Sequence, residues 1–384
     1  MKRSFAVTII LGTLPCFAAM PVAGATASTP AEVMQLEGQE RFAEAMPSWM
    51  NILQAKPDDP QTLAHLGLLE AEQGHYSAAI DFYRRAMAKD PQLPGLEMNL
   101  GLAYFKNGQF ADALQPFSDE LKRRPGDDRL TLLMGMTHYG MGDYLVAIPY
   151  LQRGAERDPT SLTLWLTLAH SCLWAKQQEC VMNAYRKILA INPESAEAEM
   201  LAGEALDESG DDAGAIEHFR AAVAANPREP NAHFGLGYLL WTTRHYNEAA
   251  AEFSEEIAIN PSQGQAEAYL GDCLLELKQL EPAEQHLRTA LLRDPESELS
   301  RRDLGIVDAE LGRSEQAEAE LRHAVALDPA DSSARWHLAK LLQSLGKKEE
   351  AASEFRLLST MKKQENDNLL RKMQLHSQPA EQVR

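Results

Sequence analysis

The sequence predicts an all-α solenoid of antiparallel helix pairs, and three observations predict it. Nine prolines recur every 34 residues, from Pro57 to Pro329. Small residues lie twenty-four positions before eight of these prolines, and a second column of mostly alanine lies twelve before each. A fixed period of this length indicates one supersecondary unit stacked many times, because each unit is too small to bury its apolar face alone.

Each 34-residue unit is expected to be two amphipathic helices joined by a tight turn. Large apolar residues such as Leu66 precede the first small column, and glycines such as Gly74 mark the turn. Small residues on both helices let their axes approach closely. The proline ends the unit, because it donates no backbone hydrogen bond and disfavours a helical conformation at the preceding residue.

These units divide the chain into five parts. Nine units in register cover about residues 60–365; unit one is residues 60–93 and each later unit starts 34 residues further on. A degenerate repeat that serves as an N-terminal cap is expected over 28–59. After the units we expect a C-terminal capping helix over 366–376, since a solenoid needs a lid with a polar outer face. The polar residues 377–384 are expected to be a disordered tail.

The first 27 residues have the pattern of a secretory signal peptide. Lys2 and Arg3 precede an apolar run over residues 5–14, and residues 25–27 read Ala-Thr-Ala, a typical cleavage pattern. An uncleaved membrane anchor is the alternative, although prolines interrupt the run. The sequence therefore predicts an exported protein, periplasmic or secreted.

The formal net charge of −19 restricts the partners. An acidic surface repels phosphate, so nucleic acid and anionic lipid are not expected to bind. No second apolar stretch of spanning length follows the leader, so we expect no membrane insertion after cleavage. Other proteins, above all those with basic segments, are the expected partners.

The repeated positions resemble the tetratricopeptide repeat, and nearly all of the chain after the leader shares the pattern. The clearest matches are residues 94–127, with Leu100, Gly101, Tyr104, Ala113, Phe117 and Pro125, and residues 196–229, with Gly203, Ala215, Phe219, Ala222 and Pro227. The resemblance implies a right-handed superhelix whose inner groove is lined by the first helix of each unit. A likeness to exported bacterial repeat proteins further suggests the bacterial envelope as the setting.

In that family the groove is lined by the second, fifth, ninth and twelfth positions of a unit. Here these positions give an apolar and aromatic strip and two acidic residues: Met98, Leu102, Phe105, Leu132, Met136, Tyr139, Leu166, His170, Leu173, Phe234, Tyr238, Trp241, Glu204 and Asp207. An extended peptide with apolar anchors and a Lys or Arg would suit such a groove. The alternative is that part of the strip is packing shared by all such repeats.

Unit four departs from the pattern and holds two cysteines. Ala169, Lys176 and Val181 replace its usual small residues and turn glycine. Cys172 and Cys180 lie across one helix hairpin, so a disulfide there could clamp the irregular unit. They could equally be two small buried hydrophobic residues.

No catalytic or metal-binding motif appears, and no cofactor is expected. The eleven histidines are scattered, and none forms a zinc-protease pair or a nucleophile elbow. The sequence thus predicts a non-enzymatic scaffold or adaptor that binds a partner's peptide segment in its concave groove, in envelope assembly, secretion or polysaccharide export. The alternatives are a structural spacer that forms homo-oligomers, or a non-catalytic subunit that presents substrate to an envelope enzyme.

Overall fold

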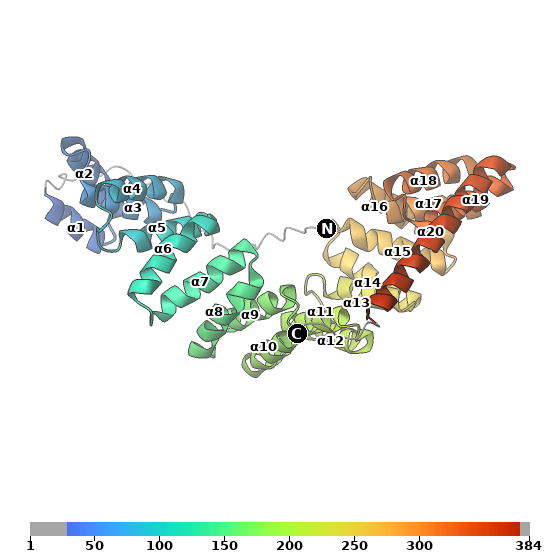
Figure 1. Cartoon of the computed structure of the whole chain (residues 1–384), viewed down its shortest axis with the longest axis horizontal. Coiled ribbons are helices and arrows are strands. Elements are labelled where there is room, and N and C mark those ends of the chain that lie inside the picture. The colour runs from blue at the N-terminus through green and yellow to red at the C-terminus, as the bar shows by residue number, and fades with distance from the viewer. Residues whose placement is uncertain (1–28, 377–384) are drawn as a thin grey trace. The chain divides into compact units, whose positions relative to one another are not determined.

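The computed structural model describes residues 29–376, and the regular structure of these residues is entirely helical (Figure 1). The predicted signal peptide over 1–27 and the predicted tail over 377–384 lie outside the described residues. Two compact units of the chain, 1–142 and 143–384, are described separately below.

The N-terminal compact unit contains seven of the described helices. They are α1 (Pro30–Gly38), α2 (Phe42–Ala55), α3 (Pro60–Glu72), α4 (Tyr76–Lys89), α5 (Leu96–Lys106), α6 (Phe110–Arg123) and α7 (Asp128–Met141). Consecutive helices pack as antiparallel neighbours, and the pair α1 and α2 occupies the place expected for the degenerate first repeat.

The C-terminal compact unit continues the same alternation. Its helices are α8 (Tyr144–Arg157), α9 (Leu162–Trp174), α10 (Gln178–Ile191), α11 (Ala196–Glu208), α12 (Asp212–Ala225), α13 (Ala232–Thr242), α14 (Tyr246–Ile259), α15 (Gly264–Glu276), α16 (Leu280–Arg293), α17 (Glu298–Glu310), α18 (Ser314–Leu327), α19 (Ser332–Ser344) and α20 (Lys348–His376). The 34-residue period is therefore the spacing of successive helix pairs, as the sequence predicts.

Local chemistry sets the ends of these helices. Asp59 caps α3, because its side chain accepts a hydrogen bond from the backbone N–H of Thr62 at 2.8 Å. At the turn inside a unit the backbone enters the left-handed region, as Gly74 does with φ 79°. Unit four has Lys176 there with φ 57°, a conformation that costs a residue with a side chain more than it costs glycine.

The two columns of small residues lie where paired helices touch. A Cβ atom on Gly203 would lie 2.7 Å from Cδ2 of Phe219 and 3.3 Å from the carbonyl oxygen of Ala215 on the facing helix. The alanine at the second column is fully buried in most units. Larger side chains would force the hairpins apart, which explains why both columns recur.

Residues 366–376 do not form a separate capping helix, which corrects the sequence-based expectation. They belong to α20, a single helix of 29 residues that begins at Lys348. The reason is the missing proline: the residue 34 positions after Pro329 is Lys363, which continues the helix instead of ending it. The last unit thus lacks the exit turn that the other units have.

Within the C-terminal unit the first helices of neighbouring pairs contact one another in turn, from α9 through α11, α13, α15 and α17 to α19. The second helices of successive pairs show no comparable contacts among the described elements. Because the first helices are the closer row, their outward side is the inner face of this unit. In the described part of the chain, no helix combines the length and the apolar character needed to cross a bilayer.

Candidate functional site

The centre of the inner face is an aromatic cluster on α13 and α15. The ring centroids of Tyr238 and Trp241 lie 5.8 Å apart, and Tyr269 lies 5.6 Å from the first and 5.0 Å from the second. Phe234 completes the cluster, 5.9 Å from Tyr269. All four side chains are only partly buried, so their ring faces remain available to a partner.

An ionic network fixes one edge of this cluster. The indole Nε1 of Trp241 donates a hydrogen bond to Oδ2 of Asp272 at 2.5 Å. Arg302 on α17 donates to the other oxygen of Asp272 at 3.4 Å and to Asp303 at 2.7 Å. Trp241 is therefore held in one orientation by a carboxylate that is itself held by an arginine.

Burial and neighbouring charges shift the pKa values in this network. Burial raises the pKa of Asp303 well above its usual range, and the charge of Asp272 adds to that shift against the opposing effect of Arg302. Burial alone would lower the pKa of Arg302, but the surrounding aspartates outweigh it and raise that pKa. Arg302 therefore stays charged, and it is already committed to these carboxylates rather than to a ligand.

A second group of carboxylates lies on α11 next to the aromatic cluster. Glu204 and Asp207 are both exposed at the solvent edge of the helix. Loss of hydration among the surrounding groups raises the pKa of Glu204, while the nearby His170 partly offsets this. The pKa of Asp207 is also raised, by the same loss of hydration and by the charges of Asp212 and Glu208. A cationic side chain from a partner would relieve this repulsion.

On α9 the predicted groove residues do not behave alike. Leu166 and His170 are partly exposed, and Nε2 of His170 lies 3.1 Å from a carboxylate oxygen of Glu197 on α11. Leu173, by contrast, is buried and offers almost no surface to a partner, which corrects its predicted place in the groove. The neighbouring Trp174 is exposed instead and stacks on His170 with a centroid distance of 5.3 Å.

The other six predicted residues lie in the N-terminal compact unit. They are Met98, Leu102 and Phe105 on α5 and Leu132, Met136 and Tyr139 on α7, and all six are partly buried. Phe105 packs against Phe110 and Phe117, with centroid distances of 5.5 and 6.4 Å. Part of this strip is therefore packing, as the alternative interpretation of the sequence held.

Tyr269, Arg302 and Trp174 belong to the site but were not among the predicted residues. Arg302 is at the fifth position of unit eight, so continuing the positional rule beyond unit six would have found it. Tyr269 and Trp174 occupy the sixth and thirteenth positions, which the rule leaves out. Only the helix packing shows that these two positions border the same face.

The structure places the sulfur atoms of Cys172 and Cys180 at bonding distance, with their Cα atoms 5.6 Å apart. Cys172 is buried on α9 and Cys180 is partly exposed on α10. Cys273 on α15 is buried, and burial raises the pKa of its thiol to about 12. A thiol in such surroundings is inert packing rather than a nucleophile.

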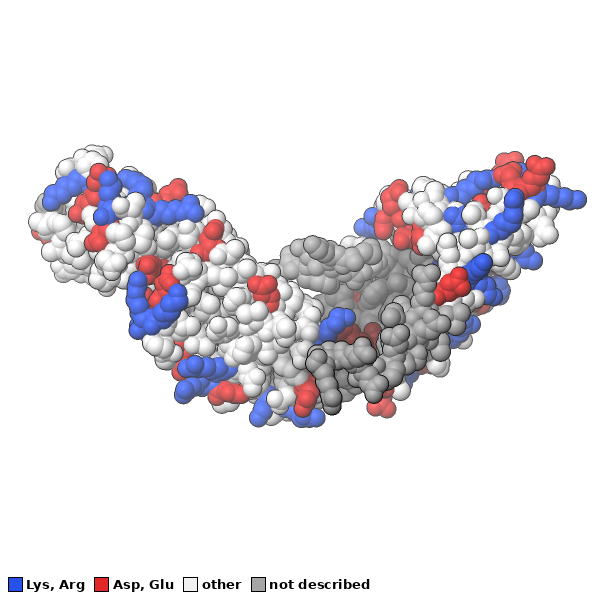
Figure 2. Space-filling view, viewed as in Figure 1, with Lys and Arg blue, Asp and Glu red and all other residues white. Residues whose placement is uncertain are grey.

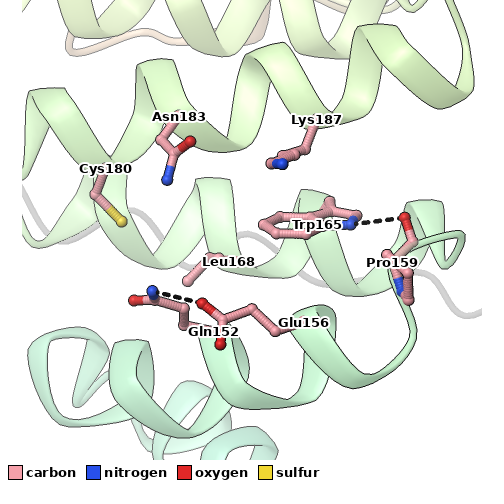
Figure 3. Close-up of a pocket in the computed structure, with 8 residues that line it drawn as sticks. All are labelled: Gln152, Glu156, Pro159, Trp165, Leu168, Cys180, Asn183 and Lys187. Atoms are coloured by element: carbon pink, nitrogen blue, oxygen red, sulfur yellow. Dashed lines mark hydrogen bonds between the residues drawn. The ribbon is translucent and has the colours of Figure 1, made fainter.

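A pocket of about 400 Å³ opens beside Cys180, between α8 and α10 and above α9 (Figure 3). Trp165 and Leu168 form its floor, and the indole N–H of Trp165 donates to the carbonyl oxygen of Pro159 at 3.1 Å. Lys187 and Asn183 line one wall, while Gln152 and Glu156 line the other. The pocket lies on the second-helix side, away from the aromatic cluster.

Comparisons with known proteins agree with this architecture. Sequence profiles described as tetratricopeptide repeat or TPR repeat match residues 67–108, 183–230, 213–264, 240–301 and 302–361. The chain belongs to the tetratricopeptide repeat family. Its members are typically protein-interaction scaffolds. No curated protein matches this TPR chain.

Solved structures show the same fold at low sequence identity. The C-terminal part of a TPR repeat-containing protein from Cytophaga hutchinsonii is 16% identical, with a TM-score of 0.50 over 62% of this chain and 98% of that one. A TPR protein from Parabacteroides merdae is 16% identical, with a TM-score of 0.47 over 65% and 98%. YrrB, described as a TPR protein with an unusual peptide-binding site, is 19% identical, with a TM-score of 0.40 over 46% and 92%.

The described residues contain no cluster of three or more His, Cys, Asp or Glu side chains placed to hold a metal ion. The chemistry offered by the site is therefore that of aromatic surface and carboxylates. Such groups can bind apolar and cationic side chains.

Proposed function

We propose that this TPR protein is a scaffold that holds an extended segment of another protein along its first-helix face. The observation that carries the proposal is the partly exposed cluster of Tyr238, Trp241 and Tyr269, with Trp241 oriented by Asp272. Aromatic side chains held in one orientation lose little entropy when they bind, and they supply large contact areas.

The chemistry of the segment follows from the charges beside the cluster. Glu204 and Asp207 on α11 are exposed, and the raised pKa of each shows that it lacks sufficient stabilisation of its charged form. A Lys or Arg in the segment would supply it, while apolar side chains cover the rings. Acidic peptides are disfavoured by the same carboxylates.

The test compares two double variants in affinity capture from extracts of the native host. Tyr238→Ala/Trp241→Ala removes exposed ring surface from α13, and Leu145→Ala/Val146→Ala removes exposed apolar surface from α8. We expect a partner retained by the wild type and the α8 variant to be lost by the α13 variant. Equal retention by all three proteins, with unchanged circular dichroism, would contradict the proposed binding face.

We also propose that the scaffold works outside the cytoplasm, as the signal-like residues 1–27 suggest. The setting would be envelope assembly, secretion or polysaccharide export. The measurement is N-terminal sequencing of the protein isolated from a periplasmic or medium fraction. A mature N-terminus near residue 28 is expected; a cytoplasmic protein that keeps Met1 would refute export.

A further inference from the structure

The C-terminal end of the described chain carries a slot between the first turns of α19 and the middle of α20. Its volume is about 700 Å³, and Trp336, Leu358, Met361 and Lys362 line it together with Ala330, Ser332 and Ser333. Trp336 is 45% exposed, although tryptophan carries more apolar surface than any other side chain. This slot lies at a different place from the aromatic cluster of the proposed binding face.

One unit earlier, the same place is occupied by a helix. Leu358 corresponds to Ala324, which is completely buried, and Trp336 corresponds to Arg302. The occupant there is α19, which packs against both α17 and α18. The slot is therefore the position at which the first helix of a further unit would pack, continuing an interface that recurs along the solenoid.

Residues up to 376 do not fill this position. They follow Lys363 along the axis of α20, whereas the residues after each proline turn back to form the next first helix. Leu358 and Met361 are left only partly buried as a result.

The charges around the slot are basic. Lys362 lines it, and Nζ of Lys340 lies 5.4 Å from the ring centroid of Trp336. Lys and Arg side chains are visible over α19 and α20, beside Asp and Glu, in Figure 2. In the preceding interface Asp331, just before the incoming α19, approaches Arg302 within 3.8 Å. An incoming helix with carboxylates at its edge would meet Lys340 and Lys362 in a similar way.

The N-terminal end of a second copy does not supply the required surface. Positions 32 and 35 of α1 are in register with the buried Leu66 and Leu69 of α3, but they hold exposed Glu32 and Gln35. That face of α1 is polar, as a solenoid cap requires. It lacks the apolar side chains that would cover Trp336 and Leu358.

We propose that the slot binds an amphipathic helix of another protein, in the way that α19 packs on the unit before it. The apolar face of this helix would cover Trp336, Leu358 and Met361, and its acidic edge would face Lys340 and Lys362. The scaffold would thus hold two partners, an extended segment on its first-helix face and a helix at its C-terminal end.

The probe is a fluorescent, side-chain-stapled peptide with the sequence of residues 195–209. In the chain these residues form α11, whose buried Ala198, Leu201, Ala202 and Ala205 pack into the equivalent position of the preceding pair, and whose exposed side is acidic. The staple is needed because isolated helices of about 15 residues are marginal in water. Fluorescence anisotropy measures its binding to the full chain.

Two variants of neighbouring leucines decide the result. Leu358→Glu puts a charge inside the slot, and Leu357→Glu puts the same charge on the next residue, which is 44% exposed and does not line the slot. We expect binding to weaken by about tenfold or more with Leu358→Glu and to change less than about twofold with Leu357→Glu. Lys340→Glu/Lys362→Glu should weaken it also, and should remove its dependence on salt.

Equal binding by the wild type and all these variants would overturn the proposal. So would a concentration-dependent mass in sedimentation that only Leu358→Glu abolishes, since the slot would then hold a second copy. A chain that ends at residue 376 and binds the probe far more tightly than the full chain would show that residues 377–384 cover the slot. Retention of binding by Tyr238→Ala/Trp241→Ala is expected, because the two surfaces are separate.

Discussion

The residue at the fourth position of a unit reaches back to the proline carbonyl six residues earlier in four of the described units. Trp165, His233, Arg301 and Arg335 each make this contact, at 2.9 to 3.1 Å. His233, Arg301 and Arg335 also pair with a glutamate nineteen residues later on the second helix, at 2.6 to 2.7 Å. One side chain therefore ties the exit turn of one unit to both helices of the next.

Unit four has no such pair, because Ala184 stands where the other three units have Glu252, Glu320 and Glu354. The indole of Trp165 fills only part of the space that a longer side chain at position 184 would occupy. This substitution accounts for the pocket beside Cys180, and it explains at the level of single residues why the irregular unit is hollow on its second-helix side.

Glu284 gives a pH-dependent prediction. Both of its oxygens accept hydrogen bonds from Arg313, at 2.7 and 2.6 Å, and Arg288 adds another, so its pKa falls to about 2. A carboxyl with a lowered folded pKa stabilises the protein above its unfolded pKa, about 4.3, and loses that effect as the pH falls towards 2. Glu284→Gln should therefore lower the free energy of unfolding by about 1–2 kcal/mol at pH 7, after allowance for the partial exposure of Arg313.

Urea unfolding at pH 7 and at pH 2.5 checks the prediction for Glu284. The difference between wild type and variant should shrink at the lower pH, and Glu255→Gln, an exposed residue of α14, should show little difference at either. A penalty that is equal at both pH values would mean that Glu284 acts by packing and not by charge.

The cysteine pair gives a second prediction at this scale. If Cys172 and Cys180 are bonded, alkylation in denaturant without reductant should label Cys273 and neither of them, and reduction should expose two more thiols. Cys172→Ala should make Cys180 reactive and destabilise the protein by about 2–3 kcal/mol, because the bond closes a short loop. Intact-mass spectrometry counts the labels; two extra labels before reduction would disprove the bond.

At the scale of helices, the sequence predicted the pairs and their spacing because both follow from a strict period. The prolines, the small columns and the turn glycines report contacts between residues near in sequence, and these contacts are the same in each unit. The end of α20 was predicted wrongly, because the polarity of residues 366–376 suggested a new helix while the absent proline at Lys363 decides that the old one continues.

The site could be predicted only in part, and for a similar reason. The positional rule identified Tyr238 and Trp241 because they repeat a shared role. Leu173 followed the rule and is nevertheless buried, and Tyr269 lies outside the rule and yet borders the cluster. Which side of a helix remains exposed depends on the size of its neighbours in the adjoining pairs, and a pattern within one unit does not contain that information.

Restoring the missing proline tests the account of α20. Lys363→Pro should end the helix near residue 362, as proline removes a backbone hydrogen bond and clashes with the preceding turn. We expect a small loss of ellipticity at 222 nm, corresponding to about ten residues, and rapid amide exchange after residue 363. Lys363→Ala is the control and should keep the full signal; unchanged exchange in the proline variant would contradict the interpretation.

At the scale of the whole molecule, helices contact mainly their neighbours in sequence, and the contacts divide into the compact units 1–142 and 143–384. In such a chain stability is approximately a sum over units and their nearest-neighbour interfaces. Unfolding of one region need not accompany unfolding of a distant one. A single two-state transition is therefore not expected.

Phe117 and Phe253 offer a matched test of this independence. Both are completely buried, and both occupy the same position of their units, Phe117 in the N-terminal compact unit and Phe253 in the C-terminal one. Each Phe→Ala change should cost about 3–5 kcal/mol by leaving a cavity. Hydrogen exchange followed by mass spectrometry should then show faster exchange around α5, α6 and α7 for Phe117→Ala, and around α13, α14 and α15 for Phe253→Ala. If either substitution accelerated exchange equally throughout residues 29–376, the two compact units would have to unfold as one, and nearest-neighbour contacts would not describe the stability of this solenoid.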